Sequence, residues 1–238
     1  MTQTTVPVIF DLDGTLVDPA GGITDGIAAA LTELGLPVPG QDLLDAMIGP
    51  KLSDSLQNVA MVPADMIGDV ILLYRQYYMA TGIGQGRLYP GIMDVLDSFA
   101  AAGRPVAVAT QKPQGLAQTV LEHHGIAGRF QFIRGSADDE SAAAAGPVGK
   151  TGIIAAALRD LSTHHAVMVG DRAQDVAGAI ANGLDCIGVS WGFAPDGELQ
   201  DAGAITVVDT APDLVAAVER LEAIHAAAMS EVQNDGTV

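Results

Sequence analysis

The chain is poor in cysteine and in basic residues. Its 238 residues include one cysteine, Cys186, which cannot form a disulfide within the chain and fits a reducing compartment. Only 11 residues are Lys or Arg, against 29 Asp or Glu, which gives a formal net charge of -18. General binding of nucleic acids or anionic membranes needs an excess of positive charge. The composition therefore argues against both functions.

Long apolar runs and a leader-like start are absent as well. No stretch approaches the roughly 18–20 uninterrupted apolar residues needed to cross a bilayer. The first five residues contain no basic segment, and no long apolar run follows them, so we expect no signal peptide. These features predict a cytoplasmic protein. We separately expect a monomer or a homodimer. Because only 4 % of the residues are aromatic, we expect a core of Val, Leu, Ile and Ala.

Short apolar runs alternate with helical patterns along most of the chain. Five runs have the profile of strands buried on both faces of a sheet: Val6–Phe10, Pro105–Ala109, Ala166–Val169, Leu184–Val189 and Ala204–Val208. Helical patterns lie between them, for example over Gln114–His124 and Ala173–Asn182. The alternation predicts a doubly wound α/β domain with a mostly parallel sheet. Ligands of such sheets bind at the carboxyl ends of the strands.

Between residues 19 and 85 the strands disappear and only helical patterns remain. Ile23, Ile27 and Leu31 share one helical face, and Gly35 follows as a helix terminator. We therefore predict an α-helical domain inserted over 19–85. The α/β domain is then built from 1–18 and 86–229, with a disordered polar tail over 230–238 and an Ala/Gly-rich loop over 141–149.

The first predicted strand ends in an acidic pair. Its carboxylates, Asp11 and Asp13, point to the same side because they are two residues apart on a strand. Like charges at this spacing need a cation between them, or one of them takes a proton. Gly14 allows a tight turn, and Thr15 offers a hydroxyl and backbone N–H groups to an anion. A turn with an Asp helix cap is the alternative interpretation.

The run Asp11-Leu12-Asp13-Gly14-Thr15-Leu16-Val17-Asp18 resembles motif I of the haloacid dehalogenase (HAD) superfamily. The resemblance implies a Rossmann-like core in which Asp11 attacks phosphorus to form an aspartyl phosphate. It also implies that Asp13 protonates the leaving oxygen and then activates the hydrolytic water. An acyl phosphate suits this chemistry because it divides one difficult step into two easier ones.

Motifs II and III of the family have counterparts further along the chain. Thr110 ends the second strand and would donate its hydroxyl to a phosphoryl oxygen. Gln111 follows it where relatives often have Asn or Ser, which leaves its role open. Lys150, at a predicted helix start, would neutralise charge between Asp11 and the phosphoryl group.

Motif IV corresponds to Asp171 and Asp175, which follow a strand and are four residues apart at a helix start. Both can face one cation at this spacing, although each alone is also a common helix cap. The resemblance implies a Mg²⁺ ion held by Asp11, the backbone carbonyl of Asp13, Asp171, and Asp175 directly or through water. Hard oxygen ligands favour Mg²⁺ over zinc.

Only three of the basic residues are lysines: Lys51, Lys112 and Lys150. Where Arg is the prevailing cation, a remaining Lys can mark a place that needs a compact charge, though chance composition is the alternative. Lys51 lies in a loop between predicted helices of the inserted domain. We expect substrate contacts from six residues: Gly14, Thr15, Lys51, Gln111, Lys112 and Arg172.

Within the superfamily, the layout looks most like the phosphoglycolate phosphatase and bacterial 5′-nucleotidase branch, which has a helical cap between motifs I and II. Similar runs include Ile48-Gly49-Pro50, Arg75-Gln76-Tyr77-Tyr78 and Gly170-Asp171-Arg172. The resemblance implies a Mg²⁺-dependent phosphatase for a small phosphorylated metabolite. A phosphomutase, a 2-haloacid dehalogenase and a phospho-ligand binder without turnover are the alternatives. A dehalogenase needs neither the metal nor Asp13, so the presence of Asp13 and of the Asp171 and Asp175 pair argues against it. A protein that only binds a phosphorylated ligand gains nothing from carboxylates beside the phosphate, which argues against the binder.

Two histidine pairs, His123-His124 and His164-His165, lack the spacing and the cysteine partners of a metal site. We interpret both pairs as solvated structural residues. Cys186 lies in an apolar strand pattern and is expected to be a small core residue.

Overall fold

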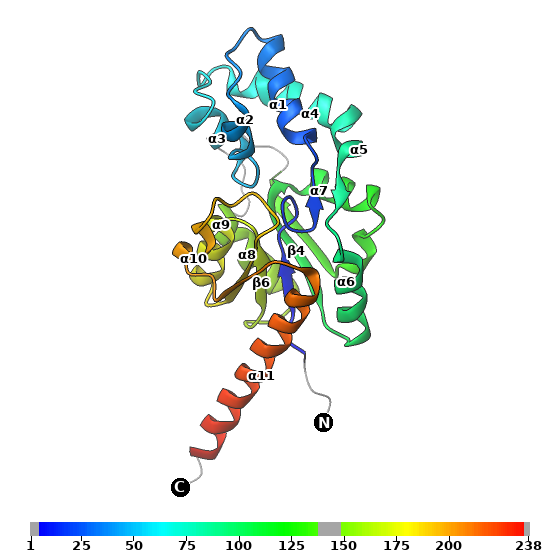
Figure 1. The fold of residues 1–238 in the computed structure, drawn as a ribbon, viewed down its shortest axis with the longest axis vertical. Helices are drawn as coiled ribbons and strands as arrows, with labels where there is room; N and C mark the ends of the chain where they lie inside the picture. Colours follow the sequence, from blue (N-terminus) through cyan, green and yellow to red (C-terminus); the bar gives the residue numbers. More distant parts are fainter. Residues whose placement is uncertain (1–4, 138–148, 236–238) are drawn as a thin grey trace.

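The structure is a computed structural model that describes residues 5–137 and 149–235. A six-stranded sheet lies at the centre of its larger domain (Figure 1). All neighbouring strands pair in parallel, in the order β5-β4-β1-β6-β7-β8. The strands are β1 (Val8–Phe10), β4 (Val106–Pro113), β5 (Phe132–Ser136), β6 (Val167–Gly170), β7 (Asp185–Val189) and β8 (Thr206–Val208). The doubly wound α/β prediction is confirmed.

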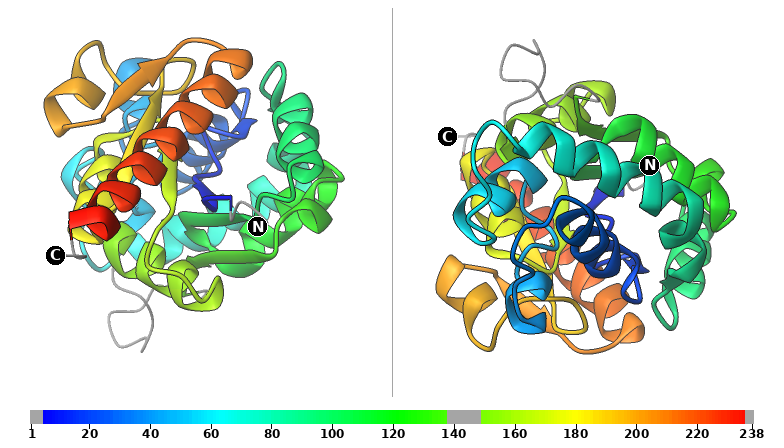
Figure 2. Two further views of the ribbon diagram at one scale, coloured as in Figure 1. Left: turned by 90° about the horizontal axis from the view of Figure 1, so that it is seen from below. Right: turned by 90° about the horizontal axis from the view of Figure 1, so that it is seen from above.

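Helices cover both faces of this sheet (Figure 2). One face carries α6 (Ile92–Ala101), α7 (Gln114–His123) and α11 (Ala211–Asp235), with the 3-10 turn η2 (Ala127–Arg129) after α7. The other face carries α8 (Gly149–Asp160), α9 (Ala173–Ala181) and α10 (Glu198–Ala202). Successive strand residues serve opposite faces: Val8 and Phe10 pack toward α6, and Ile9 packs toward α8. Burial on both faces explains why the central strands β1 and β6 contain no polar side chain.

A helical cap lies over the carboxyl edge of the sheet (Figure 1). Its elements are α1 (Gly22–Glu33), α2 (Gln41–Asp45), α3 (Leu52–Asn58), α4 (Ile67–Tyr77), the π-helix η1 (Tyr78–Gly82) and α5 (Ile83–Gln85). The chain enters and leaves the cap through an antiparallel pair, β2 (Val17–Asp18) and β3 (Arg87–Leu88). The two crossings therefore lie side by side, which is the geometry of a hinge.

Three local features differ from the expectations or fall outside them. Strand β5 was not predicted, because Arg134 and Gly135 break its apolar pattern at the edge of the sheet. Helix α11 runs to Asp235, although a disordered tail was expected from residue 230. Glu231 and Gln233 favour a helix, and residues 230–235 contain no Gly or Pro. Most of the expected loop over 141–149 lies outside the described residues, and its last residue, Gly149, begins α8.

The described helices include none that combines the length and the apolar character of a membrane span.

Strand β5 approaches the end of β4 more closely than a side chain would allow. A Cβ atom on Gly135 would lie 2.5 Å from the Lys112 carbonyl oxygen and 2.6 Å from the Gln114 Cα. The register between β4 and β5 also shifts between Ala109 and Pro113. Gly135 therefore allows the backbone at residues 110–113 to keep its irregular path at the carboxyl edge.

We predict that Gly135→Ala lowers the free energy of unfolding by about 1–3 kcal/mol, since backbone atoms rather than a flexible side chain must move. Gly128→Ala is the control, because no atom lies within 4 Å of the added Cβ. It should change stability by no more than about 0.5 kcal/mol. Urea unfolding of the two variants measures the difference, and equal stabilities would contradict the proposed close approach.

Candidate active site

The first acidic pair lies in a tight loop directly after β1. The Asp11 N–H continues the sheet by donating to the Val169 carbonyl, at 2.9 Å. The loop then closes on itself, because the Val17 N–H donates to the Leu12 carbonyl and the Gly14 N–H to the Val17 carbonyl. Gly14 has a φ of 83°, which L side chains rarely adopt. The loop fixes Asp11 and Asp13 at the carboxyl edge of the sheet.

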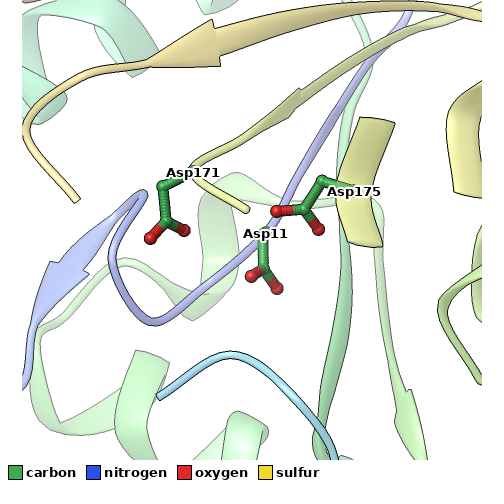
Figure 3. Close-up of side chains that lie close together, drawn as sticks. All are labelled: Asp11, Asp171 and Asp175. Carbon is green, nitrogen blue, oxygen red and sulfur yellow. The ribbon is translucent and has the colours of Figure 1, made fainter. Parts of the chain in front are cut away.

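Asp11, Asp171 and Asp175 form a buried acidic cluster (Figure 3). One oxygen from each carboxylate lies within 4.8 Å of the others. Neighbouring parallel strands end at the same edge of the sheet, and this brings the three residues together. Asp171 follows β6, the neighbour of β1, and Asp175 lies in the first turn of α9. The cluster joins two motifs that are 160 residues apart in sequence.

Asp171 is held on both sides. Its Oδ1 accepts a hydrogen bond from the Thr15 hydroxyl at 3.0 Å, and its Oδ2 accepts one from the Phe193 N–H at 2.9 Å. A Cβ atom on Gly14 or Gly192 would lie 2.1 or 2.3 Å from Asp171 atoms. The carboxylate therefore fills a slot that only glycine neighbours leave open. Sequence reasoning missed Phe193 and Gly192 because a backbone N–H and a close approach leave no motif.

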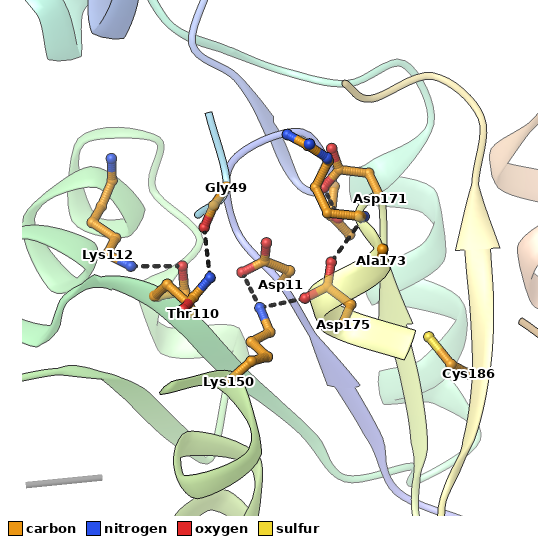
Figure 4. A network of polar contacts seen from close by, with 12 residues as sticks. Asp11, Gly49, Thr110, Lys112, Lys150, Asp171, Ala173, Asp175 and Cys186 are labelled. Atoms are coloured by element: carbon orange, nitrogen blue, oxygen red, sulfur yellow. Dashed lines mark hydrogen bonds and ion pairs between the residues drawn. The ribbon is translucent and has the colours of Figure 1, made fainter. Parts of the chain in front are cut away.

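Lys150 neutralises part of the acidic charge. Its Nζ lies 2.7 Å from Asp11 and 2.5 Å from Asp175, in the first turn of α8 (Figure 4). Burial alone would lower the pKa of Lys150, but Asp11 and Asp175 raise it above its usual value. The ammonium group thus stays charged, and the structure brings it to the position that the sequence predicted.

Excess negative charge remains after Lys150 is counted. Burial, followed by repulsion from Asp175 and Asp11, raises the pKa of Asp171 well above its usual value. Burial also raises the pKa of Asp175 from 3.8 to about 6, although Lys150 opposes the rise. Three carboxylates around one ammonium, all with hard oxygen donors, are a donor set that fits a divalent cation.

Asp13 forms a separate ion pair, with Lys112. Its Oδ2 lies 2.8 Å from the Lys112 Nζ, and both side chains are buried. Burial raises the pKa of Asp13, although Lys112 opposes the rise. Next to this pair, the Thr110 hydroxyl accepts a hydrogen bond from the Lys112 N–H at 3.2 Å. Thr110 and Lys112 therefore lie together beside Asp13.

Two residues expected to contact substrate form hydrogen bonds with the cap. The Gln111 side-chain amide donates to the Gly49 carbonyl at 3.0 Å, and the Arg172 guanidinium donates to the Ile48 carbonyl at 2.6 Å. Glu198 in turn accepts a hydrogen bond from Arg172 Nε at 3.0 Å. These bonds hold the cap loop against the core.

A pocket lies between the cap and the core, with Asp11 and Asp13 at its base. The cap side is mostly apolar and includes Met47, Ile48 and Leu52, with Arg75 as a charged member. Lys51 is not among the residues that line this pocket, although Pro50 and Leu52 on either side are. Arg75 was not predicted as a site residue, because the helical pattern of α4 shows only its buried face.

We predict that Asp171→Asn stabilises the protein in EDTA at pH 7.5, because it removes one of three clustered charges. Burial, with repulsion from Asp11, raises the pKa of Asp175 from 3.8 to about 6, which corresponds to roughly 3 kcal/mol of lost stability at neutral pH; the pKa of Asp171 is raised by the same two causes. Protonation relieves this cost below the raised pKa, so stability is lost as pH rises through it. The variant's advantage should therefore be about 1–3 kcal/mol at pH 7.5 and shrink toward pH 5.

Thermal unfolding across this pH range measures the effect, and excess Mg²⁺ should reverse the order of the two proteins. A wild type more stable than Asp171→Asn at pH 7.5 in EDTA would contradict the electrostatic account.

Known proteins share this architecture. The chain is 39 % identical over 188 residues to tyrosine-protein kinase PtkA of Mycobacterium tuberculosis, covering 78 % of this chain and 62 % of PtkA. It thus spans less than two thirds of that relative's length. It is 33 % identical over 195 residues to a 5′-nucleotidase of Pseudomonas aeruginosa, covering 81 % of this chain and 86 % of the relative. It is also 33 % identical over 198 residues to a phosphoglycolate phosphatase of Yersinia pseudotuberculosis, covering 78 % and 81 %.

Among solved structures, a predicted phosphatase from Clostridium acetobutylicum superposes with a TM-score of 0.84 at 33 % identity, covering 91 % of this chain and 99 % of that one. Residues 8–189 match the model of the haloacid dehalogenase-like hydrolase family. The match includes Asp11, Thr110, Lys150 and Asp171, which the fold brings to one edge of the sheet. The chain belongs to the haloacid dehalogenase-like hydrolase family.

Proposed function

We propose that the protein is a Mg²⁺-dependent phosphatase that hydrolyses a small phosphomonoester through an aspartyl phosphate on Asp11. The observation that carries the proposal is the buried cluster of Asp11, Asp171 and Asp175 with Lys150 beside it. A pocket between the cap and the core includes Asp11, one member of this cluster, in its lining. Its position at the carboxyl edge of a parallel sheet is where such folds bind ligands.

Asp11 serves as the nucleophile in this proposal. Its carboxylate lines the pocket, and Lys150 holds it at 2.7 Å. The positive charge of Lys150 offsets repulsion between the carboxylate and an incoming phosphate, and the Thr110 hydroxyl donates to a phosphoryl oxygen. Asp11, the backbone carbonyl of Asp13, Asp171 and Asp175 would hold a Mg²⁺ ion, which supplies further neutralisation of phosphoryl charge.

Asp13 serves as the general acid and base. It lines the pocket, is only 6 % exposed and is paired with Lys112. It would give a proton to the leaving oxygen and then take one from the water that hydrolyses the aspartyl phosphate. The cap loop, bonded to Gln111 and Arg172, excludes bulk water while the intermediate exists.

The substrate in this proposal is a small phosphorylated metabolite, such as phosphoglycolate or a nucleoside monophosphate. Relatives named for both activities support the proposal. The pocket offers apolar cap side chains beside the charged Arg75 and Lys112, and this combination suits a leaving group with both apolar and polar parts.

Phosphoryl transfer to another hydroxyl is the second candidate function, because the M. tuberculosis relative is named a tyrosine-protein kinase. The same aspartyl phosphate would then pass to a tyrosine, or to a sugar in a phosphomutase, rather than to water. If the substrate carried a labelled phosphoryl group, the label would appear on the acceptor instead of as free phosphate in solution. A 2-haloacid dehalogenase, by contrast, would work on a chloroacid without metal.

We predict that Asp11→Asn lowers Mg²⁺-dependent phosphate release by about 10⁴-fold or more, because an amide does not replace the nucleophile. EDTA should abolish the wild-type activity. Asp97→Asn is the matched control. Asp97 is an exposed residue of α6 that pairs with Arg129 of η2, and neither residue lines the pocket. A phosphate-release assay over a panel of phosphomonoesters measures all three, and full activity of Asp11→Asn would disprove the proposed nucleophile.

A further inference from the structure

The ammonium group of Lys112 lies between the core and the cap. On the core side it is 2.8 Å from Asp13 Oδ2. On the cap side it donates a hydrogen bond to the Tyr78 hydroxyl at 3.4 Å and lies 4.5 Å from the centre of the Tyr78 ring. Both side chains are buried, with Tyr78 only 2 % exposed. A continuous polar chain thus links a cap residue to Asp13.

The two oxygens of Asp13 have different surroundings. Oδ2 is paired with Lys112, whereas Oδ1 is buried and has no hydrogen-bond partner among the described residues. A buried carboxylate oxygen without a partner is costly, so its retention calls for a functional reason. Asp13 lines the pocket, and Oδ1 is the oxygen that its ion pair with Lys112 leaves without a hydrogen bond.

The backbone around Lys112 is fixed. The Lys112 N–H donates to the Thr110 hydroxyl, and the Lys112 carbonyl lies against Gly135 of β5. Lys112 is the last residue but one of β4, so its stem leaves a packed sheet rather than a free loop. Its ammonium group is therefore anchored from the core and does not depend on a bound ligand for its position.

Tyr78 is equally well placed within the cap. It begins the π-helix η1, and its ring stacks on Tyr74 at 5.6 Å between centroids. A π-helical turn re-aims side chains relative to an α-helix and is frequent at functional sites. Because Tyr78 belongs to the cap and Lys112 to the core, their contact exists only when the cap lies where the structure places it.

We propose that Lys112 and Tyr78 are positioning residues for Asp13. Lys112 holds Oδ2 and leaves Oδ1 to exchange a proton with a ligand, and Tyr78 completes this arrangement when the cap closes. Proton transfer is thereby coupled to cap closure. The inference rests on the proposed phosphatase function and differs from the sequence-based expectation that Lys112 contacts substrate.

The proposal is tested with Lys112→Met on two substrates that differ in their need for an acid. Propyl phosphate has a poor leaving group without a second charge, whereas p-nitrophenyl phosphate has a leaving group that departs unprotonated. For propyl phosphate we expect kcat to fall about 100-fold, as for loss of general acid catalysis, with KM changed less than about threefold. For p-nitrophenyl phosphate, kcat/KM should fall less than about fivefold, because that constant reports formation of the aspartyl phosphate.

Tyr78→Phe tests the contribution of the cap. The variant keeps the ring beneath the ammonium and removes only the hydroxyl, so kcat on propyl phosphate should fall about threefold to tenfold. Tyr77→Phe is the matched control, since Tyr77 neither lines the pocket nor contacts Lys112, and its kcat should equal that of the wild type. Thermal unfolding checks that each variant folds. If Lys112→Met does not fold, Tyr78→Phe provides the test, by the same comparison of propyl phosphate with p-nitrophenyl phosphate.

Four results would overturn the inference. A raised KM with unchanged kcat for Lys112→Met would make Lys112 a substrate-binding residue, and an equal loss on both esters would remove the link to proton transfer. Wild-type kcat in Tyr78→Phe would break the coupling to the cap. Absence of Mg²⁺-dependent phosphate release from the wild type would overturn the proposed function and this inference together, whereas the other results leave the proposed function standing.

Discussion

Repulsion among buried carboxylates is the constraint around which this molecule is organised. Asp11, Asp171 and Asp175 lie within 4.8 Å of one another at the carboxyl edge of the sheet, and one ammonium group, from Lys150, lies between two of them. Such a cluster opposes folding unless positive charge or hydrogen-bond donors compensate it. Thr15, the Phe193 N–H and the Arg172 N–H provide donors to its members. The remaining imbalance is what makes the site ready for a divalent cation.

The parallel sheet and the cap turn this cluster into an enclosed reaction site. Adjacent parallel strands end at the same edge, which is why residues from β1, β4 and β6 meet there. The paired strands β2 and β3 connect the cap at that same edge, so the cap loop reaches across the pocket to Gln111 and Arg172. The Asp13–Lys112–Tyr78 chain then joins the chemistry of the core to the position of the cap.

Much of this arrangement could be predicted because it follows from local patterns. The placement of Asp11 and Asp171 needed only apolar runs that end in carboxylates and the rule for strand ends. The partners of Lys112 and Arg172 could not be predicted, because they depend on where the cap lies over the core. Strands β2 and β3 have two residues each, too few for any periodicity. Strand β5 is hidden by Gly135, whose close approach to β4 is visible only in three dimensions.

The most direct test of the account is to trap the covalent intermediate. The protein is mixed with substrate and Mg²⁺, quenched within milliseconds and reduced with borohydride, which converts an aspartyl phosphate to homoserine. Peptide mass spectrometry then locates the modified residue. The account predicts homoserine at position 11, and none when EDTA replaces Mg²⁺. Modification at another residue, or turnover without any covalent phosphate, would contradict it.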